Sequence, residues 1–231
     1  MKKLGIIGGI GPEATINYYL AAIKRTQKIL GTTKQLPEIV INSINMYHMF
    51  DLLERKDYPA VVAYLVKAAN ELQAAGADFG LMCGNTPHIV FDQVQQQTSL
   101  PLLSIVTTAL KQAQSLQLKR VVLLGTKFTM QNTFFSQPFI DAGIKLALPD
   151  SAEQAWLHQK IVDELDNGVV KRETKQRLLH MTQHLIEQYQ LDGLILGCTE
   201  LPLILHPIDF SVAVLDTAKI HVERATELIL S

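Results

Sequence analysis

Short, uninterrupted hydrophobic runs alternate with longer amphipathic stretches along the 231 residues of this chain. Apolar runs without polar alternation are typical of strands that are buried on both faces of a parallel sheet. Such runs predict strands at residues 4–7, 38–43, 79–82, 102–106, 121–124, 194–196 and 212–215. Apolar residues at helical spacing predict amphipathic helices over residues 13–30, 58–75 and 172–189. The alternation predicts an α/β fold with mostly parallel sheets flanked by helices.

Two pairs of segments resemble each other, which predicts two pseudo-symmetric domains. GADFGLMCGNTPH, from Gly76, is matched by QLDGLILGCTELP, from Gln190, and KLGIIG, from Lys3, is matched by RVVLLG, from Arg120. The two offsets differ by only three residues. We therefore expect a first α/β domain of residues 1–100 plus 210–231 and a second of residues 101–209, with a cleft between them.

Composition excludes several classes of protein. Hydrophobic residues make up 48% of the chain and charged residues 19%, which is typical of a globular rather than a disordered protein. A net charge of −1 without any basic stretch gives no support for a nucleic-acid or membrane partner. The chain has two cysteines and neither a C-x-x-C motif nor a His/Cys cluster. We expect a cytoplasmic protein without a targeting segment, metal or cofactor.

The two cysteines each follow a predicted strand within the repeated segments. A cysteine in such a place is by default a small buried hydrophobe. Cys198 precedes Thr199, Glu200 and a helix start at Pro202, and the dipole of that helix is expected to lower the pKa of the thiol. The sequence therefore favours Cys198 as a proton-transferring group.

Cys83 falls one residue early in the repeat. Aligning Asp78 with Asp192 places Gly84, not Cys83, against Cys198. Because a one-residue slip along a strand turns a side chain to the opposite face, we expect the Cys83 sulfur to point into the sheet packing. A kink at Gly84 is the alternative that returns the sulfur to the cleft.

Polar residues follow the other predicted strands. The Gly-rich turn that runs from Gly8 to Thr15 is neither a P-loop nor a dinucleotide fingerprint, and it is either a tight turn or a carboxylate site. Asn85 and Thr86 are either helix caps or ligands for a substrate carboxylate. His88, one turn further, is more typical of a core histidine than of a general acid or base.

These motifs resemble the aspartate/glutamate racemase family. The resemblance rests on five motifs in order, namely Gly8–Thr15, Asn85-Thr86-x-His88, Gly125-Thr126-x-x-Thr129-Met130, Gly197-Cys198-Thr199-Glu200 and Asp216-Thr217, and it extends from Lys3 to about His221. It implies two α/β domains with the active site between them, a homodimer, and no pyridoxal phosphate. It also implies that two thiols exchange the α-proton of an amino acid.

The resemblance predicts an isomerase, an amino-acid racemase that acts on aspartate, glutamate or a related acidic amino acid. Cys198 and Cys83 are the catalytic candidates. The candidates for substrate binding are Thr15, Asn85, Thr86, Thr126, Thr129, Thr199 and Glu200. The family's first cysteine directly precedes Asn-Thr, where this chain has Gly84. Alternatives are a single-thiol decarboxylase or dicarboxylate isomerase on the same scaffold, and a non-catalytic protein that binds a small carboxylate.

Overall fold

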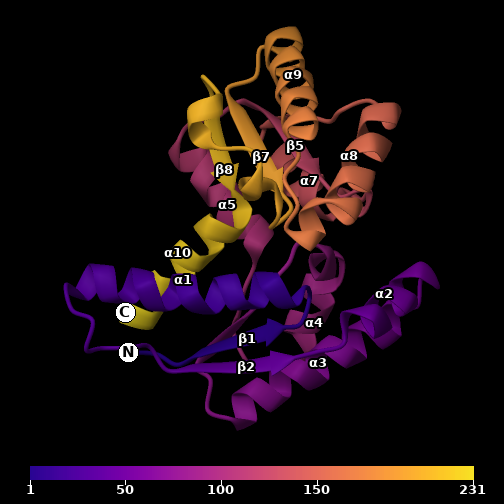
Figure 1. The fold of residues 1–231 in the computed structure, drawn as a ribbon. Coiled ribbons are helices and arrows are strands. Elements are labelled where there is room, and N and C mark those ends of the chain that lie inside the picture. Colours follow the sequence, from indigo (N-terminus) through magenta and orange to yellow (C-terminus); the bar gives the residue numbers. More distant parts are fainter. The chain divides into compact units, whose positions relative to one another are not determined.

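The computed structural model describes all 231 residues, which form two compact units. Unit 1 comprises residues 1–108 and 218–231, and unit 2 comprises residues 109–217. Each unit contains a four-stranded parallel sheet, as the hydrophobic runs predict. The strands and helices of both units are drawn in Figure 1.

Eight strands form the two sheets. They are β1 (Leu4–Gly8), β2 (Ile39–Ser43), β3 (Phe79–Met82), β4 (Leu102–Leu103), β5 (Arg120–Gly125), β6 (Lys145–Ala147), β7 (Gly193–Gly197) and β8 (Ala213–Asp216). The order is β2-β1-β3-β4 in unit 1 and β6-β5-β7-β8 in unit 2, so the two sheets have equivalent topologies.

Ten α-helices follow or precede these strands. They are α1 (Pro12–Leu30), α2 (Met46–Glu54), α3 (Tyr58–Ala74), α4 (Phe91–Gln97), α5 (Ile105–Ser115), α6 (Lys127–Gln131), α7 (Thr133–Asp141), α8 (Ser151–Asp163), α9 (Arg172–Tyr189) and α10 (Thr217–Leu230). Four 3₁₀-helices are η1 (Thr86–Val90), η2 (Leu165–Asn167), η3 (Leu201–Leu203) and η4 (Pro207–Asp209). None of the helices is long and apolar enough to cross a membrane.

The unit boundaries fall later than the expected positions near residues 100 and 210. β4 pairs with β3, so residues 102–103 belong to the first sheet rather than the second. β8 pairs with β7, so residues 213–216 belong to the second sheet rather than the first. Each sheet therefore takes its fourth strand from the segment that leads to the other unit, and the chain leaves each unit only after that strand has paired.

Two local differences from the expected elements have simple causes. The apolar run 102–106 is a strand only over Leu102–Leu103, because α5 begins at Ile105. β6 was not predicted: it is three residues long and begins with an exposed lysine, so it lacks the apolar run of a central strand.

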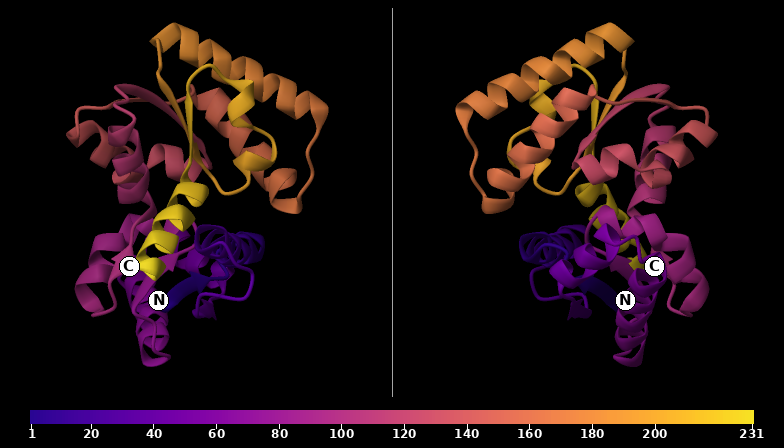
Figure 2. Two further views of the ribbon diagram at one scale, coloured as in Figure 1. Left: turned by 90° about the vertical axis from the view of Figure 1, so that its left-hand side faces the viewer. Right: turned by 90° about the vertical axis from the view of Figure 1, so that its right-hand side faces the viewer.

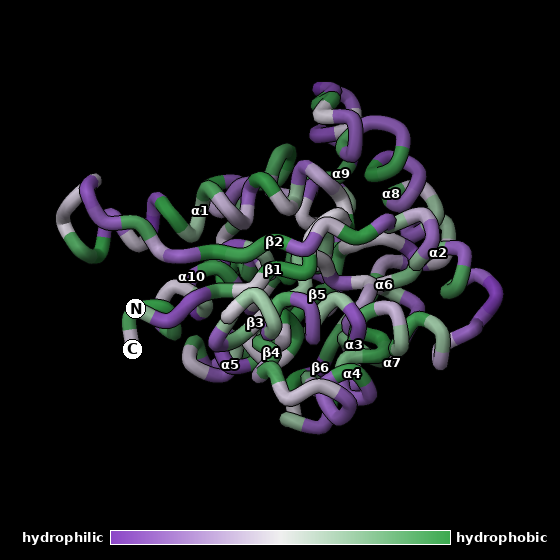
Figure 3. Tube along the Cα trace, turned by 90° about the horizontal axis from the view of Figure 1, so that it is seen from below, coloured by the Kyte–Doolittle hydropathy of each residue, from purple (hydrophilic) through white to green (hydrophobic).

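In unit 1, α1 and α10 pack on one face of the sheet. Leu4 and Ile6 of β1 and Leu81 of β3 share a buried cluster with side chains of both helices. α3 packs on the opposite face, where Gly5 leaves room for it, because a Cβ on Gly5 would lie 3.1 Å from the Leu72 side chain. The hydropathy colours of Figure 3 show α1 alternating between hydrophobic and hydrophilic positions, as expected for a helix buried along one side.

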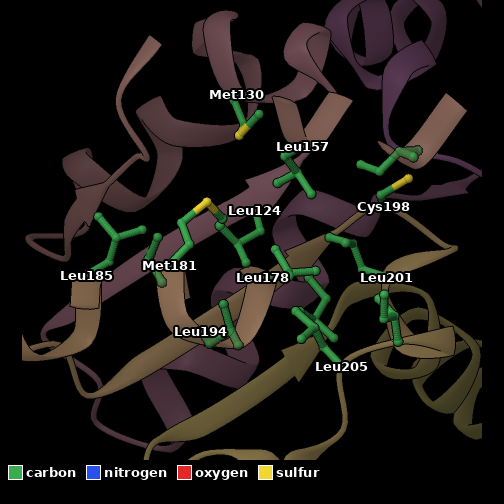
Figure 4. Close-up of a cluster of buried hydrophobic side chains, with 14 of the residues drawn as sticks. Leu124, Met130, Leu157, Leu178, Met181, Leu185, Leu194, Cys198, Leu201 and Leu205 are labelled. Atoms are coloured by element: carbon green, nitrogen blue, oxygen red, sulfur yellow. The ribbon is translucent and has the colours of Figure 1, made fainter. Parts of the chain in front are cut away.

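In unit 2, α8 and α9 pack on one face of the sheet and α5 and α7 on the other (Figure 2). Alternate residues of the central strands β5 and β7, among them Leu124, Leu194 and Leu196, join Leu157 of α8 and Leu178 of α9 in one buried cluster. Figure 4 shows this cluster.

Two buried histidines bind parts of unit 1 that are distant in sequence. His88 accepts a hydrogen bond from the Ile105 amide at 3.1 Å through Nε2, and its Nδ1 lies 2.9 Å from the Gly84 carbonyl. His221 of α10 lies 3.0 Å from the Leu103 carbonyl through Nε2 and 3.0 Å from the Tyr18 hydroxyl through Nδ1. Each ring donates to one carbonyl and accepts at its other nitrogen, which is the pattern of a neutral imidazole.

These histidines predict a loss of stability at mildly acidic pH. Burial and then the neighbouring His221 lower the pKa of His88 to about 3, and burial lowers the pKa of His221 to about 4. Both pKa values lie below those of the unfolded chain, so the stabilisation is present above about pH 6.5 and is lost as the pH falls. We expect the free energy of unfolding to fall by about 3 kcal/mol between pH 7 and pH 5. Urea unfolding at these pH values measures it, and His221→Gln should reduce the slope.

A buried carboxylate stabilises the end of α8 in unit 2. The Glu164 side chain is 3% exposed and lies 2.6 Å from Lys160 Nζ and 3.2 Å from Lys171 Nζ. The Thr174 hydroxyl also donates to it at 2.6 Å. Hydrogen bonds from Lys160 and then Thr174 lower the pKa of Glu164 to about 2.

Glu164→Gln should therefore lower the free energy of unfolding by about 1–3 kcal/mol, because two ammonium groups lose their shared carboxylate. Glu227→Gln is the matched control, because Glu227 pairs with Arg224 at 2.7 Å while its side chain is 52% exposed. The control should change stability by less than about 0.5 kcal/mol. Equal effects of the two substitutions in chemical denaturation would contradict this assignment.

Candidate functional site

Parallel pairing gathers the polar loops of each unit at one edge of its sheet. In unit 1, Ile7 of β1 pairs with Met82 of β3, so the Gly-rich turn and Cys83 follow adjacent strands. In unit 2, Gly125 of β5 pairs with Gly197 of β7, so Thr126 and Cys198 leave the sheet side by side. The carboxyl edge of a parallel sheet is where such folds place ligands and chemistry.

Cys198 is the best-defined group at the edge of unit 2. Cys198 follows Leu194 and Leu196 at every second position, so its side chain lies on the same face of the sheet, which α8 and α9 cover. Cys198 is 9% exposed. Figure 4 shows it at the margin of the apolar cluster, close to Leu157 and Leu201. Its thiol donates a hydrogen bond to Glu200 Oε2, with sulfur and oxygen 2.9 Å apart.

The pKa of the Cys198 thiol is raised well above its ordinary value, which contradicts the expected lowering by a helix dipole. Burial is the largest cause, and the nearby Glu200 carboxylate adds to it. The expected dipole is missing because the element after β7 is η3, a 3₁₀-helix of only three residues. The resting protein therefore holds a protonated thiol bound to a carboxylate.

Glu200 connects the two other polar groups of this loop. The Thr199 hydroxyl donates to Glu200 Oε1 at 2.6 Å, and the Cys198 thiol donates to Oε2. Each carboxylate oxygen therefore has a donor from the same short loop. A carboxylate in this position repels a second carboxylate, so Glu200 is suited to accepting a proton or binding an ammonium group rather than holding a substrate anion.

Thr126 and Thr129 are tied to the start of α6. Thr126 is the N-cap of α6, and its Oγ1 accepts from the Thr129 amide at 3.3 Å and lies 3.2 Å from the Thr129 hydroxyl. Thr129 is 1% exposed and Thr126 is partly exposed. Of these two predicted binding residues, Thr126 is the one that a ligand can reach without a rearrangement.

Cys83 lies inside the packing of unit 1. It is 0% exposed and belongs to the cluster beneath α1 and α10. Its sulfur lies 3.2 Å from Thr15 Oγ1, which also accepts from the Gly9 amide at 2.8 Å. The same Thr15 oxygen lies 3.0 Å from the Gly11 carbonyl, to which its hydroxyl donates. The sulfur and the hydroxyl together fix the Gly-rich turn.

Gly84 occupies the position that precedes Asn85 and Thr86. A Cβ on Gly84 would lie 3.2 Å from the Ile10 carbonyl oxygen, so the turn after β1 packs closely on this residue. Asn85 is 6% exposed, whereas Thr86 is partly exposed at the start of η1. His88 has hydrogen bonds at both ring nitrogens and is 5% exposed, in agreement with its interpretation as a core histidine.

The pairing of Cys198 with Glu200 was not predicted from the sequence, which assigned Glu200 to substrate binding. The only available signal was the two-residue spacing after a strand, and that spacing does not fix where a side chain points. No group of three or more His, Cys, Asp and Glu side chains is arranged to hold a metal ion.

Two parallel α/β units, each with a cysteine at the end of a central strand, define the class of amino-acid racemases that this chain resembles in sequence. Residues 7–225 match the family described as Asp/Glu/Hydantoin racemase. The chain belongs to this racemase family and is an isomerase acting on amino acids.

Relatives and solved structures agree with this membership. The "Broad specificity amino-acid racemase RacX" of Bacillus subtilis (strain 168) is 26% identical over 219 residues, which cover 93% of this chain and 92% of the relative. A crystal structure from Yersinia pestis, whose name describes the protein as an Asp/Glu racemase, superposes on this chain with a TM-score of 0.93. The two sequences are 31% identical, and both chains are fully covered. An aspartate racemase homologue from Pyrococcus horikoshii OT3 gives a TM-score of 0.89 at 34% identity, again over both full chains.

The raised thiol pKa predicts how the cysteines react with an alkylating agent. Glu200→Gln removes the negative charge beside Cys198, so the pKa of the thiol should fall and alkylation at pH 8 should become faster by about three- to tenfold. Iodoacetamide labelling followed by peptide mass spectrometry measures each cysteine separately, and Cys83 should react only after unfolding. Glu187→Gln, on the exposed side of α9, is the control and should change nothing. Unchanged or slower labelling of Cys198 in Glu200→Gln would contradict the assignment.

Proposed function

We propose that this chain is a cofactor-independent amino-acid racemase in which Cys198 and Glu200 act as a proton-transferring pair. The observation that supports the proposal most directly is the 2.9 Å hydrogen bond from the Cys198 thiol to Glu200 Oε2. A thiol that is held protonated is a poor base, and an adjacent carboxylate that accepts its proton makes it a competent one.

The reaction conserves protons as follows. The Cys198 proton moves to Glu200, and the resulting thiolate removes the α-proton of the amino acid, which leaves a carbanion and a re-formed thiol. Racemisation is complete when a hydroxyl or water gives a proton to the opposite face of that carbon and Glu200 returns its proton to this donor, which restores the resting state. Without an electron sink, donors to the α-carboxylate must stabilise the carbanion, and Thr126, which leaves the sheet of unit 2 beside Cys198, is the proposed donor.

Protonation of the second face of the carbon needs a group other than the Cys198 thiol. Cys83, which the resemblance makes the second acid/base, is completely buried and bound to Thr15. We therefore assign Cys83 a supporting role beneath the Gly-rich turn. The proton for the second face then comes from a hydroxyl or from water rather than from Cys83.

The burial of Cys83 also supports a second candidate. A site with one accessible thiol suits reactions that need only one proton-transferring group, such as decarboxylation of a malonate-like acid or α-proton exchange without inversion. Inversion of configuration distinguishes this candidate from the racemase.

The cytoplasmic location and the homodimer expected from the sequence stay predictions. Sedimentation analysis of the purified chain tests the homodimer.

Substitution of each cysteine separates the two roles. Cys198→Ala should reduce α-proton exchange by at least about 10³-fold, because the base is removed, whereas Cys83→Ala should keep most of it. Proton NMR in D2O measures exchange, and chiral chromatography of the same samples measures inversion.

Circular dichroism and thermal unfolding of both variants provide the folding control, because Cys83 lies in the core. Equal losses in two well-folded variants would contradict the proposed asymmetry and return Cys83 to the catalytic site. Exchange without inversion in the unmodified protein would favour the single-thiol candidate.

A further inference from the structure

The outer side of α1, which faces away from the sheet of unit 1, is apolar over most of its length. Ile16, Tyr19 and Leu20 are between 40% and 57% exposed. No residue from Ala14 to Ile23 carries a formal charge, so about three turns of this helix present only uncharged side chains to water. Surface helices usually carry charged and polar residues on their outer side, and a contiguous exposed apolar patch is typical of an interaction surface.

The helix α9 provides a comparison within the same chain. Its exposed positions include Arg172, Glu173, Arg177 and Glu187, and Tyr189, its last residue, is its one large hydrophobic residue that is exposed. The two helices have nearly the same length, 19 residues for α1 and 18 for α9. The apolar outer side is therefore a property of α1 and does not follow from its length.

The apolar surface continues from α1 onto the outer strand of the sheet. β2 is an edge strand of unit 1, and its Ile41 is 40% exposed. A Cβ on Gly8 would lie 2.5 Å from Thr15 Cγ2 and 3.2 Å from Ile41 Cγ2, so the Ile41 side chain is a neighbour of the start of α1. Tyr19 follows Thr15 by one helical turn. We define the α1 face as Glu13, Ile16, Tyr19, Leu20, Lys24 and Ile41.

Opposite charges lie at the two ends of the α1 face. Glu13 and Lys24 are both exposed, and no ion pair within the chain involves either of them. Because they are three helical turns apart, both lie on the same side of the helix as Leu20, separated by roughly 16 Å along its axis. The α1 face therefore has an unpaired negative charge at one end, an unpaired positive charge at the other and an apolar centre.

We propose that the α1 face binds the α1 face of a second copy of this chain, with the two helices antiparallel about a two-fold axis. This arrangement places Glu13 of each copy opposite Lys24 of the other and packs Leu20 beside the axis. A two-fold interface requires a patch that is complementary to itself, and this charge pattern meets the requirement. A partner of uniform charge would be attracted to one end of the face and repelled by the other. The inference concerns a surface of unit 1 and does not depend on the proposed function.

Sedimentation equilibrium of the full chain and of Leu20→Glu tests the interface. Leu20→Glu places two like charges beside the axis of an apolar contact, so the dissociation constant of the dimer should rise by at least about tenfold. Ile140→Glu is the matched control, because Ile140 of α7 is 51% exposed but belongs to unit 2. The control should leave the dissociation constant unchanged, and circular dichroism of all variants checks that they fold.

Charge reversal tests the antiparallel arrangement. Glu13→Lys and Lys24→Glu should each raise the dissociation constant by about three- to tenfold, because each opposes like charges at both ends of the interface. The double variant should return to within about twofold of the unmodified chain, because both ion pairs form again with reversed polarity.

The outcomes decide between the proposed interface and its alternatives. Restoration of the dimer in the double variant, together with its loss in Leu20→Glu, supports the inference. A chain that is still monomeric at about 100 μM overturns it. A dimer that Leu20→Glu leaves intact also overturns it, because such a dimer uses another surface. Weakening by both single reversals without restoration in the double variant overturns the antiparallel pairing of Glu13 with Lys24.

Discussion

Parallel pairing of the central strands is the constraint on which the arrangement of this protein depends. β1 pairs with β3 and β5 with β7, and helices cover both faces of each sheet, so these strands consist of buried apolar residues. Polar chemistry is therefore confined to the first residues after each strand. Cys83 and Cys198 both occupy such positions, yet their surroundings differ, because one continues into the core and the other reaches a carboxylate.

The difference between the two cysteines begins with strand geometry, because a displacement of one residue in the repeat places them on opposite faces of equivalent sheets. Both continue the alternation of the strand before them, towards α1 and α10 for Cys83 and towards α8 and α9 for Cys198. In unit 1 the sulfur meets Thr15 of α1 and stays completely buried. In unit 2 the loop turns so that Glu200 reaches the sulfur. The one-residue displacement of Cys83 in the repeat indicated this asymmetry.

Much of the fold could be predicted from the sequence, because long apolar runs and helical periodicity depend on local residues. The hydrophobic pattern predicted the bounds of α9 as observed, and it predicted the bounds of α1 and α3 to within one residue. It did not reveal the short edge strand β6, because pairing with β5 decides it. It also missed the early start of α5, where the Ser104 hydroxyl accepts from the Thr107 amide. The raised pKa of Cys198 could not be predicted either, because it depends on burial and on the direction of the Glu200 side chain.

The pH dependence of kcat/KM in the unmodified protein and in Glu200→Gln tests the central claim most directly. If Glu200 accepts the proton of Cys198, the unmodified protein is active at pH values at which the raised pKa keeps the thiol protonated. The account predicts that Glu200→Gln lowers kcat/KM at neutral pH and leaves a rate that rises with pH as the thiol ionises. The same rate and pH profile in both proteins would show that Glu200 is not the proton acceptor and would contradict the account.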